Sequence, residues 1–158
     1  MLENKLEKIV VNVGVGRLST QVGFDDKILP EITKELSTIT GQRPSQRKAT
    51  KSIAGFKLRQ GTTVGLKTTL RSKKMDGFFK KFFNIVLPRV RDFRGIDSNS
   101  VDKNGNLSIG LKDYLVFPEV SAEIAKINFG LEITLVPAIK KRESAMALYK
   151  KLGVPFKK

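Results

Sequence analysis

The strongest constraint on the fold is a set of short segments that alternate apolar and polar residues. Residues 8–13, 64–71, 107–111 and 131–135 each carry apolar side chains at every second position. Alternation with a period of two is typical of β-strands that bury one face and leave the other open. The chain is therefore expected to fold around a sheet that is covered on one side only.

Three other segments carry apolar residues at helical spacing. Residues 25–40 predict a helix that Gly41 ends, residues 72–87 predict a second helix with Ser72 as its N-cap, and residues 143–152 predict a third. Helices packed on one face of a mostly antiparallel sheet are the economical arrangement of these elements. We therefore expect an α+β fold of two layers.

Length and charge bound the size of the protein and the class of its partner. The chain has 158 residues, with 30 Lys+Arg against 15 Asp+Glu and a net charge of +15. No repeat or change of composition divides it, which predicts one domain over residues 1–158. Folded domains this basic usually bind a polyanion, most often nucleic acid and less often an anionic membrane.

Neither a membrane span nor a signal peptide is expected. No stretch approaches the about 18 uninterrupted apolar residues of a spanning helix. Residues 1–8 mix both charges and lack the apolar core of a signal peptide. A cytoplasmic location is therefore expected, or an organelle matrix.

The sequence contains no Cys and no His. It therefore lacks the residues of disulfides, thiol nucleophiles, most zinc sites and His-based acid–base catalysis. We expect no enzyme activity, no cofactor and no metal site. An enzyme acting on RNA would need a clustered acid–base or metal constellation, and the acidic residues form no such motif.

Three short motifs have simpler interpretations. Residues 14–19 begin like a dinucleotide-binding loop, but Ser19 replaces the third glycine. Residues 45–48 and 100–103 both match a Ser-Lys nucleophile pattern without its companion motifs. Residues 102–106 have the alternate spacing of a calcium loop, but their Asn-Gly pair favours a hairpin turn.

The surplus positive charge is concentrated in one quarter of the chain. Between Leu36 and Met75 there is no Asp or Glu, and the basic residues there are Arg43, Arg47, Lys48, Lys51, Lys57, Arg59, Lys67, Arg71, Lys73 and Lys74. Solvated faces usually intersperse both signs, so this run favours a nucleic-acid surface. Alternation places Lys67, Thr69 and Arg71 on the open face of the sheet, together with Lys8 and Asn12. An open polar sheet face of this kind is one way to bind RNA.

The same residues also resemble a known family. The motifs are NVGVG (12–16), GQRP (41–44), KSIAGFKLRQG (51–61), TLR (69–71), PRVRDFRG (88–95) and FPE (117–119). In this order they resemble the bacterial-type ribosomal protein L-five family of the large subunit. The resemblance runs from about Lys8 to the end of the chain.

The resemblance implies an α+β fold and a structural role in the ribosome. Family members bind 5S rRNA in the central protuberance, beside 23S-type rRNA and neighbouring proteins. A basic loop reaches the P-site tRNA, and another surface meets a small-subunit head protein across an intersubunit bridge. Family members usually carry a helical extension before the first strand, whereas the sequence here begins only a few residues ahead of it. Its connection from Arg17 to Phe24 is a few residues longer, so contacts at that edge are expected to differ.

The expected contact residues fall into three sets. For 5S rRNA they are Asn12, Gly14, Gly16, Gln42, Arg43, Arg47, Lys48, Lys67, Thr69 and Arg71, among which Asn12, Gln42 and Thr69 match the family's polar contacts. For tRNA they are Lys51, Ser52, Ala54, Gly55, Phe56, Lys57, Arg59 and Gln60. For the bridge they are Arg91, Asp92, Arg94 and Gly95. Core burial remains an equal alternative for Phe56.

Overall fold

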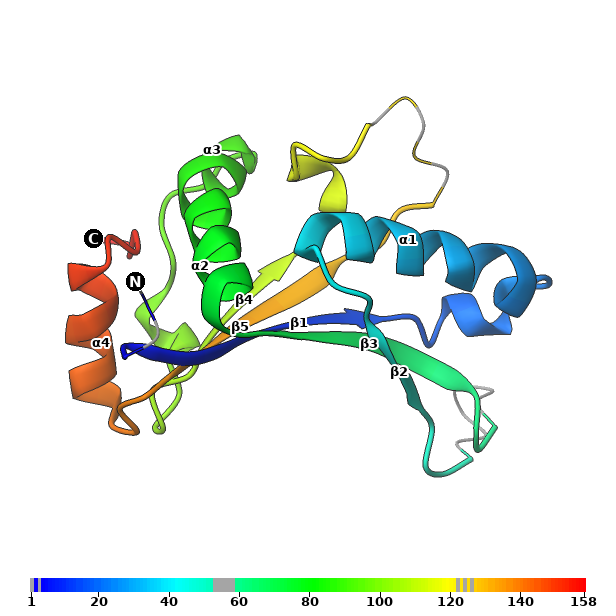
Figure 1. The fold of residues 1–158 in the computed structure, drawn as a ribbon, viewed down its shortest axis with the longest axis horizontal. Coiled ribbons are helices and arrows are strands. Elements are labelled where there is room, and N and C mark those ends of the chain that lie inside the picture. Colours follow the sequence, from blue (N-terminus) through cyan, green and yellow to red (C-terminus); the bar gives the residue numbers. More distant parts are fainter. Residues whose placement is uncertain (1, 3, 53–58, 122, 124, 126) are drawn as a thin grey trace.

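Five strands form one antiparallel sheet in the computed structural model, in the order β2-β3-β1-β5-β4 (Figure 1). The structure describes residues 2, 4–52, 59–121, 123, 125 and 127–158. The strands are β1 (Leu6–Gly14), β2 (Ser45–Lys48), β3 (Thr63–Leu70), β4 (Leu107–Leu111) and β5 (Leu131–Pro137). β1 lies at the centre of the sheet, and β2 and β4 form its edges.

The helices are α1 (Leu29–Thr40), α2 (Ser72–Lys81), α3 (Leu87–Arg89) and α4 (Arg142–Lys151). Figure 1 shows α1 and α2 above the same face of the sheet, and α4 at one end of the molecule. Further helical turns are η1 (Leu18–Thr20), η2 (Phe24–Ile28), η4 (Phe82–Val86), η5 (Ser98–Ser100) and η6 (Tyr114–Val116). The predicted two-layer α+β fold is confirmed.

Alternate residues of the strands supply one half of the core. On β1 these are Ile9, Val11 and Val13, which are almost fully buried. Apolar stripes of the helices supply the other half: Ile32, Leu36 and Ile39 of α1, and Met75, Phe78 and Phe79 of α2. Burial of each such side chain contributes roughly 1.5–3 kcal/mol. The sheet therefore keeps one strand face for the helices, as the alternation predicts.

The helical boundaries follow local backbone chemistry. Gly41 ends α1 in the left-handed region, at φ 73, as predicted. The predicted N-cap at Ser72 is wrong, because Arg71 occupies that position and Ser72 is the first helical residue, at φ 55. The second helical run also continues beyond residue 87 to Arg89, because α3 follows η4 directly and includes Pro88.

Lys81 links the two helices that cover the sheet. Its Nζ donates to the carbonyl of Ile39 at the end of α1 and to Glu119 Oε1 at 2.7 Å. The same atom lies 5.4 Å from the ring centroid of Phe78 and 5.7 Å from that of Phe117. One ammonium therefore joins α1, α2 and the FPE motif.

The turn before β4 and helix α4 pack together through a tyrosine. Asp102 and Asn106 close the predicted hairpin turn with a 2.9 Å backbone hydrogen bond, and Gly105 adopts φ 87. The buried hydroxyl of Tyr149 donates to the Gly105 carbonyl at 2.5 Å. Burial, assisted by the charge of Asp102, raises the pKa of Tyr149. The hydroxyl is therefore held protonated as a donor.

The carboxyl end of the chain docks against the PRVRDFRG motif. Ile96 pairs in parallel with Phe156, its N–H donating to the Pro155 carbonyl at 2.7 Å. Gly95 has φ 118, and a Cβ there would lie 2.7 Å from the backbone nitrogen of Lys157. Only glycine allows this close approach.

Gly95→Ala is expected to lower the free energy of unfolding by about 1–3 kcal/mol, because it combines a disfavoured φ with backbone overlap. Gly77→Ala is the control: this helical glycine has open space around it, and alanine there is expected to stabilise by about 0.5–1 kcal/mol. Urea denaturation measures both values. Equal stability of Gly95→Ala and the parent protein would contradict this account of the tail.

Candidate nucleic-acid interface

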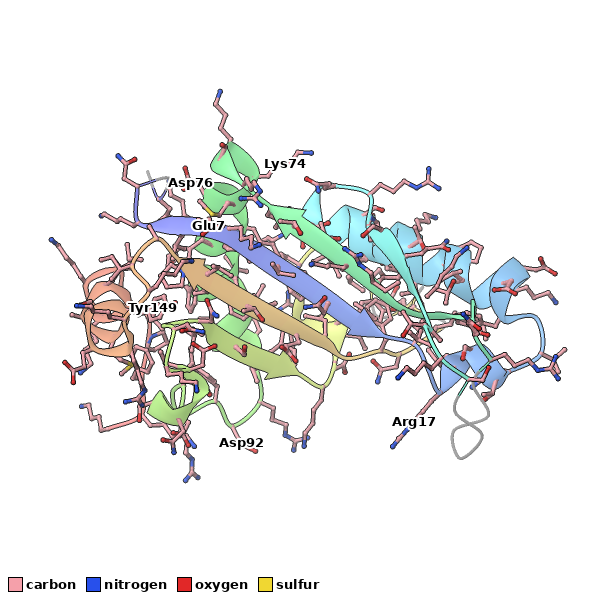
Figure 2. The ribbon with its side chains drawn as sticks, turned by 90° about the horizontal axis from the view of Figure 1, so that it is seen from below. Glu7, Arg17, Lys74, Asp76, Asp92 and Tyr149 are labelled. Carbon is pink, nitrogen blue, oxygen red and sulfur yellow. The ribbon has the colours of Figure 1, made fainter. Side chains whose placement is uncertain are left out.

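The second face of the sheet is open. Among the described residues no helix lies over it, and Figure 2 looks onto this face. The residues that alternate with the buried ones lie on this face, and all five strands contribute to it: Ser45 and Arg47 from β2, Gly65, Lys67 and Thr69 from β3, Lys8, Val10, Asn12 and Gly14 from β1, Glu132, Thr134 and Val136 from β5, and Ser108 and Gly110 from β4. We call this set the open face.

A polar row crosses the open face at its centre. Asn12 pairs with Lys67 on one side and with Glu132 on the other, and Lys67 in turn pairs with Ser45. Adjacent strands lie about 4.8 Å apart, so the row spans the sheet with closely spaced polar groups. An amide, an ammonium, a carboxylate and a hydroxyl therefore face solvent side by side.

A second row lies next to it. Thr69 pairs with Val10, which pairs with Thr134, and Thr134 Oγ1 lies 3.3 Å from the hydroxyl of Ser108. Val10 is nearly buried although it points to the open face. The predicted positions of Lys8, Asn12, Lys67 and Thr69 on this face agree with the register, and the exposed Arg71 directly follows β3.

Gln42 has a role within the fold. Its Nε2 donates to the Thr69 carbonyl at 3.0 Å, and its own carbonyl accepts from Thr40 Oγ1 at 3.0 Å. The first residue of β2, Ser45, pairs with Lys67 of β3. Because the strands are antiparallel, the Thr69 carbonyl lies past this first residue, where β2 offers no partner. The Gln42 side chain takes the place of the missing strand residue, and its Oε1 remains available as an acceptor.

Positive charge is concentrated on one side of the open face. Arg47 lies on β2, Lys67 lies on β3 and Arg71 directly follows β3. Glu132, by contrast, lies on β5. At the start of β1, the hydrogen bond and charge of Lys140 lower the pKa of Glu7, with smaller effects of Lys8 and Arg71. Glu7 and Glu132 therefore mark the limits of the basic area.

The hairpin between β2 and β3 carries the predicted tRNA loop. Its neck is closed by hydrogen bonds from the Ala49 N–H to the Thr62 carbonyl at 2.8 Å and from the Gly61 N–H to the Ala49 carbonyl at 2.9 Å. Ser52 Oγ accepts from the Gln60 N–H at 3.0 Å. Figure 1 shows the hairpin extending from one corner of the sheet.

The predicted loop residues have the following places. Lys51, Ser52, Arg59 and Gln60 are exposed beyond the neck. Ala54, Gly55, Phe56 and Lys57 lie outside the described residues. Core burial of Phe56 and its contact with RNA therefore both stay predictions.

Two glycines at the end of β1 have no internal reason to be glycine. A Cβ on Gly14 or Gly16 would meet nothing within 4 Å, and neither residue has a positive φ. Backbone conformation and packing would thus accept a side chain at both positions. The bare backbone leaves room for a partner beside the open face.

Other basic residues bond to groups within the protein or lie away from the open face. Lys140 pairs with Glu7 at 3.0 Å, and Arg142 donates to the carbonyls of Val101 and Ser98. Lys73 and Lys74 of the acid-free run belong to α2, on the helical layer. Arg91, Asp92 and Arg94 are exposed between α3 and the docked tail, whereas Gly95 serves the tail contact.

The open face also contains polar residues that the pattern of basic side chains does not indicate. Ser108, Glu132 and Thr134 are absent from the expected contacts, although alternation in 107–111 and 131–135 places them on this face. Within the described residues, no cluster of three or more acidic side chains could hold a metal ion. No described helix is long and apolar enough to cross a membrane.

Known proteins resemble the chain over nearly its whole length. Residues 1–59 match the family model "Ribosomal protein L5", and residues 63–156 match the model of the C-terminus of the same ribosomal family. The large ribosomal subunit protein uL5 of Fusobacterium nucleatum is 50% identical over 98% of this chain and 82% of its own length. Those of Ruminiclostridium cellulolyticum and Thermus aquaticus are 47% and 44% identical, over 96% and 98% of this chain and 82% of their own lengths.

Gln42→Leu is expected to lower the free energy of unfolding by about 1 kcal/mol, because the Thr69 carbonyl loses its donor. Gln21→Leu is the matched control, since Gln21 is exposed in the connection before α1 and its replacement is expected to change stability by less than about 0.5 kcal/mol. Thermal unfolding of both variants gives the comparison. A Gln42→Leu variant as stable as Gln21→Leu would remove the strand-extending role.

Proposed function

Because this chain belongs to the ribosomal protein L5 family, we propose that it is a structural constituent of the large subunit that binds 5S rRNA through its open face. The family is not one of enzymes, and an enzyme acting on RNA is set aside. The protein acts as one RNA-binding domain of the cytoplasmic ribosome, within the central protuberance and next to 23S-type rRNA and neighbouring proteins.

One observation carries the proposal: Asn12, Lys67 and Thr69 gather on the open face of neighbouring strands, beside Arg47. Cations neutralise phosphates and release counterions, which gives most of the affinity. Neutral amides and hydroxyls can bond to the ribose and to base edges, which fixes the register. The bare backbone of Gly14 and Gly16 lets the RNA approach the end of β1 closely.

Two further contacts belong to the same proposal. The hairpin beyond its closed neck reaches the P-site tRNA, with Lys51, Arg59 and Gln60 toward its backbone. The exposed Arg91, Asp92 and Arg94 face a small-subunit head protein across an intersubunit bridge. Support for both comes from the exposure of these side chains and from the family's motifs. Gly95 contributes by holding the tail rather than by contact.

Thr69→Glu is expected to weaken binding of isolated 5S rRNA at least tenfold, because a carboxylate then stands among phosphate-binding groups. Thr38→Glu is the control: it adds the same charge at an exposed position of α1 and is expected to change affinity less than threefold. Filter binding gives the affinities, and thermal unfolding checks that both variants are as stable as the parent. Unchanged affinity of a folded Thr69→Glu variant would remove the open face from the function.

Binding of 5S rRNA is also expected to depend steeply on salt. If about five phosphates are engaged, a fourfold rise in salt weakens binding by roughly two to three decades. Titrations at several potassium chloride concentrations give the slope. A response close to zero would show that phosphate contacts do not carry the affinity.

A further inference from the structure

A groove separates α1 from the edge strand β2. It consists of two adjoining cavities of about 420 and 610 Å³, whose walls share Asp25, Leu29 and Gln46. The first continues along α1 toward its carboxyl end, and the second continues along the hairpin neck toward Gly61. The groove therefore lies on the helical side of β2, away from the open face.

The walls of the groove carry more positive than negative charge. Lys34, Arg43, Lys48 and Arg59 line it, and Asp25 is its one carboxylate. All four cations are exposed, and none belongs to an ion pair among the described residues. Four unpaired cations beside a concave surface are suited to a chain of phosphates.

Two hydroxyl groups that α1 places in the groove offer only acceptors. Thr33 Oγ1 donates its proton to the Leu29 carbonyl at 2.8 Å, and Ser37 Oγ donates to the Thr33 carbonyl at 2.6 Å. Their lone pairs therefore face a partner together with the Asp25 carboxylate. Phosphate oxygens cannot donate to these groups, but a ribose 2′-hydroxyl or a base amino group can.

Positive charge continues around β2 from the open face into the groove. Arg47 points to the open face opposite Gly65, whereas the next residue, Lys48, lines the groove. A partner that leaves the open face thus meets cations on both sides of the edge strand. The open face suits a broad RNA surface, and the concave groove suits one strand.

We propose that this groove binds one unpaired strand of the RNA that lies on the open face, with phosphates at Lys34, Arg43 and Lys48 and ribose 2′-hydroxyls or base amino groups at Thr33, Ser37 and Asp25. This inference rests on the proposed RNA binding and adds a second site, specific for ribose, to it. The RNA wraps the edge of the sheet instead of ending there.

Lys34→Glu tests the phosphate contacts. It is expected to weaken binding of isolated 5S rRNA about tenfold and to lower the log–log salt slope by about 1. Lys27→Glu is the matched control, because Lys27 is an exposed lysine of the adjoining turn η2 and does not line the groove. Equal affinities and slopes of these two variants would overturn the proposal.

The double variant Thr33→Val, Ser37→Ala tests the ribose contacts. The probes are a short single-stranded RNA and a DNA of the same sequence. The parent protein is expected to bind the RNA several-fold more tightly, and the double variant is expected to lose this preference by weaker RNA binding alone. Thr38→Val controls for the helix, because Thr38 makes the same kind of bond to Lys34 at 3.0 Å but lies outside the groove. A preserved RNA preference would overturn the ribose assignment.

The outcomes separate this inference from the proposed function. If Thr69→Glu weakens binding of 5S rRNA and Lys34→Glu behaves like Lys27→Glu, the groove is wrong and the open face stands. If Thr69→Glu leaves binding intact in a folded protein, the proposed function itself fails. A groove that prefers an acidic peptide over the RNA probe in competition would also overturn the proposal.

Discussion

Burial of one strand face under α1 and α2 is the constraint on which the rest of the structure depends. Because the side-chain period of a strand is two, a slip of one residue would exchange the buried and open faces. Ile9, Val11 and Val13 cannot be exposed without large cost, so they fix the register of β1 against β3 and β5. The open face is thus the necessary complement of the core, and its polar side chains are held in place by the residues of the buried face.

The parts of the fold predictable from sequence are those in which local pattern and tertiary packing agree. The alternation in β1 and β3 and the αL glycine after α1 belong to this class. β2 does not, because Ser45–Lys48 is exposed along its whole length and carries no apolar signal; it becomes a strand through pairing with β3. The docking of Gly95 against the tail depends on residues some 60 positions apart in the sequence, and no local pattern records it.

The candidate site divides in the same way. Alternation and charge place Lys67, Asn12 and Thr69 together, since strand geometry alone decides their side. Gln42 is different: its role in extending the β3 edge follows from the end of β2 and is invisible before the pairing is known. Lys140 and Glu7 pair across 133 positions of sequence, so the charge count of the carboxyl end overstates what is free for a partner. Net charge identifies the partner's class, and geometry decides which cations are free to bind it.

The closed neck of the β2–β3 hairpin separates the stability of the sheet from the sequence of the loop. The bonds between Ala49, Gly61 and Thr62 finish the ladder before the loop begins, and the described loop residues Lys51, Ser52, Arg59 and Gln60 are all exposed. Substitutions of Lys51 or Arg59 therefore change the exposed surface of the loop without burdening the fold. Such a loop can change its sequence over evolutionary time while the sheet that supports it stays the same.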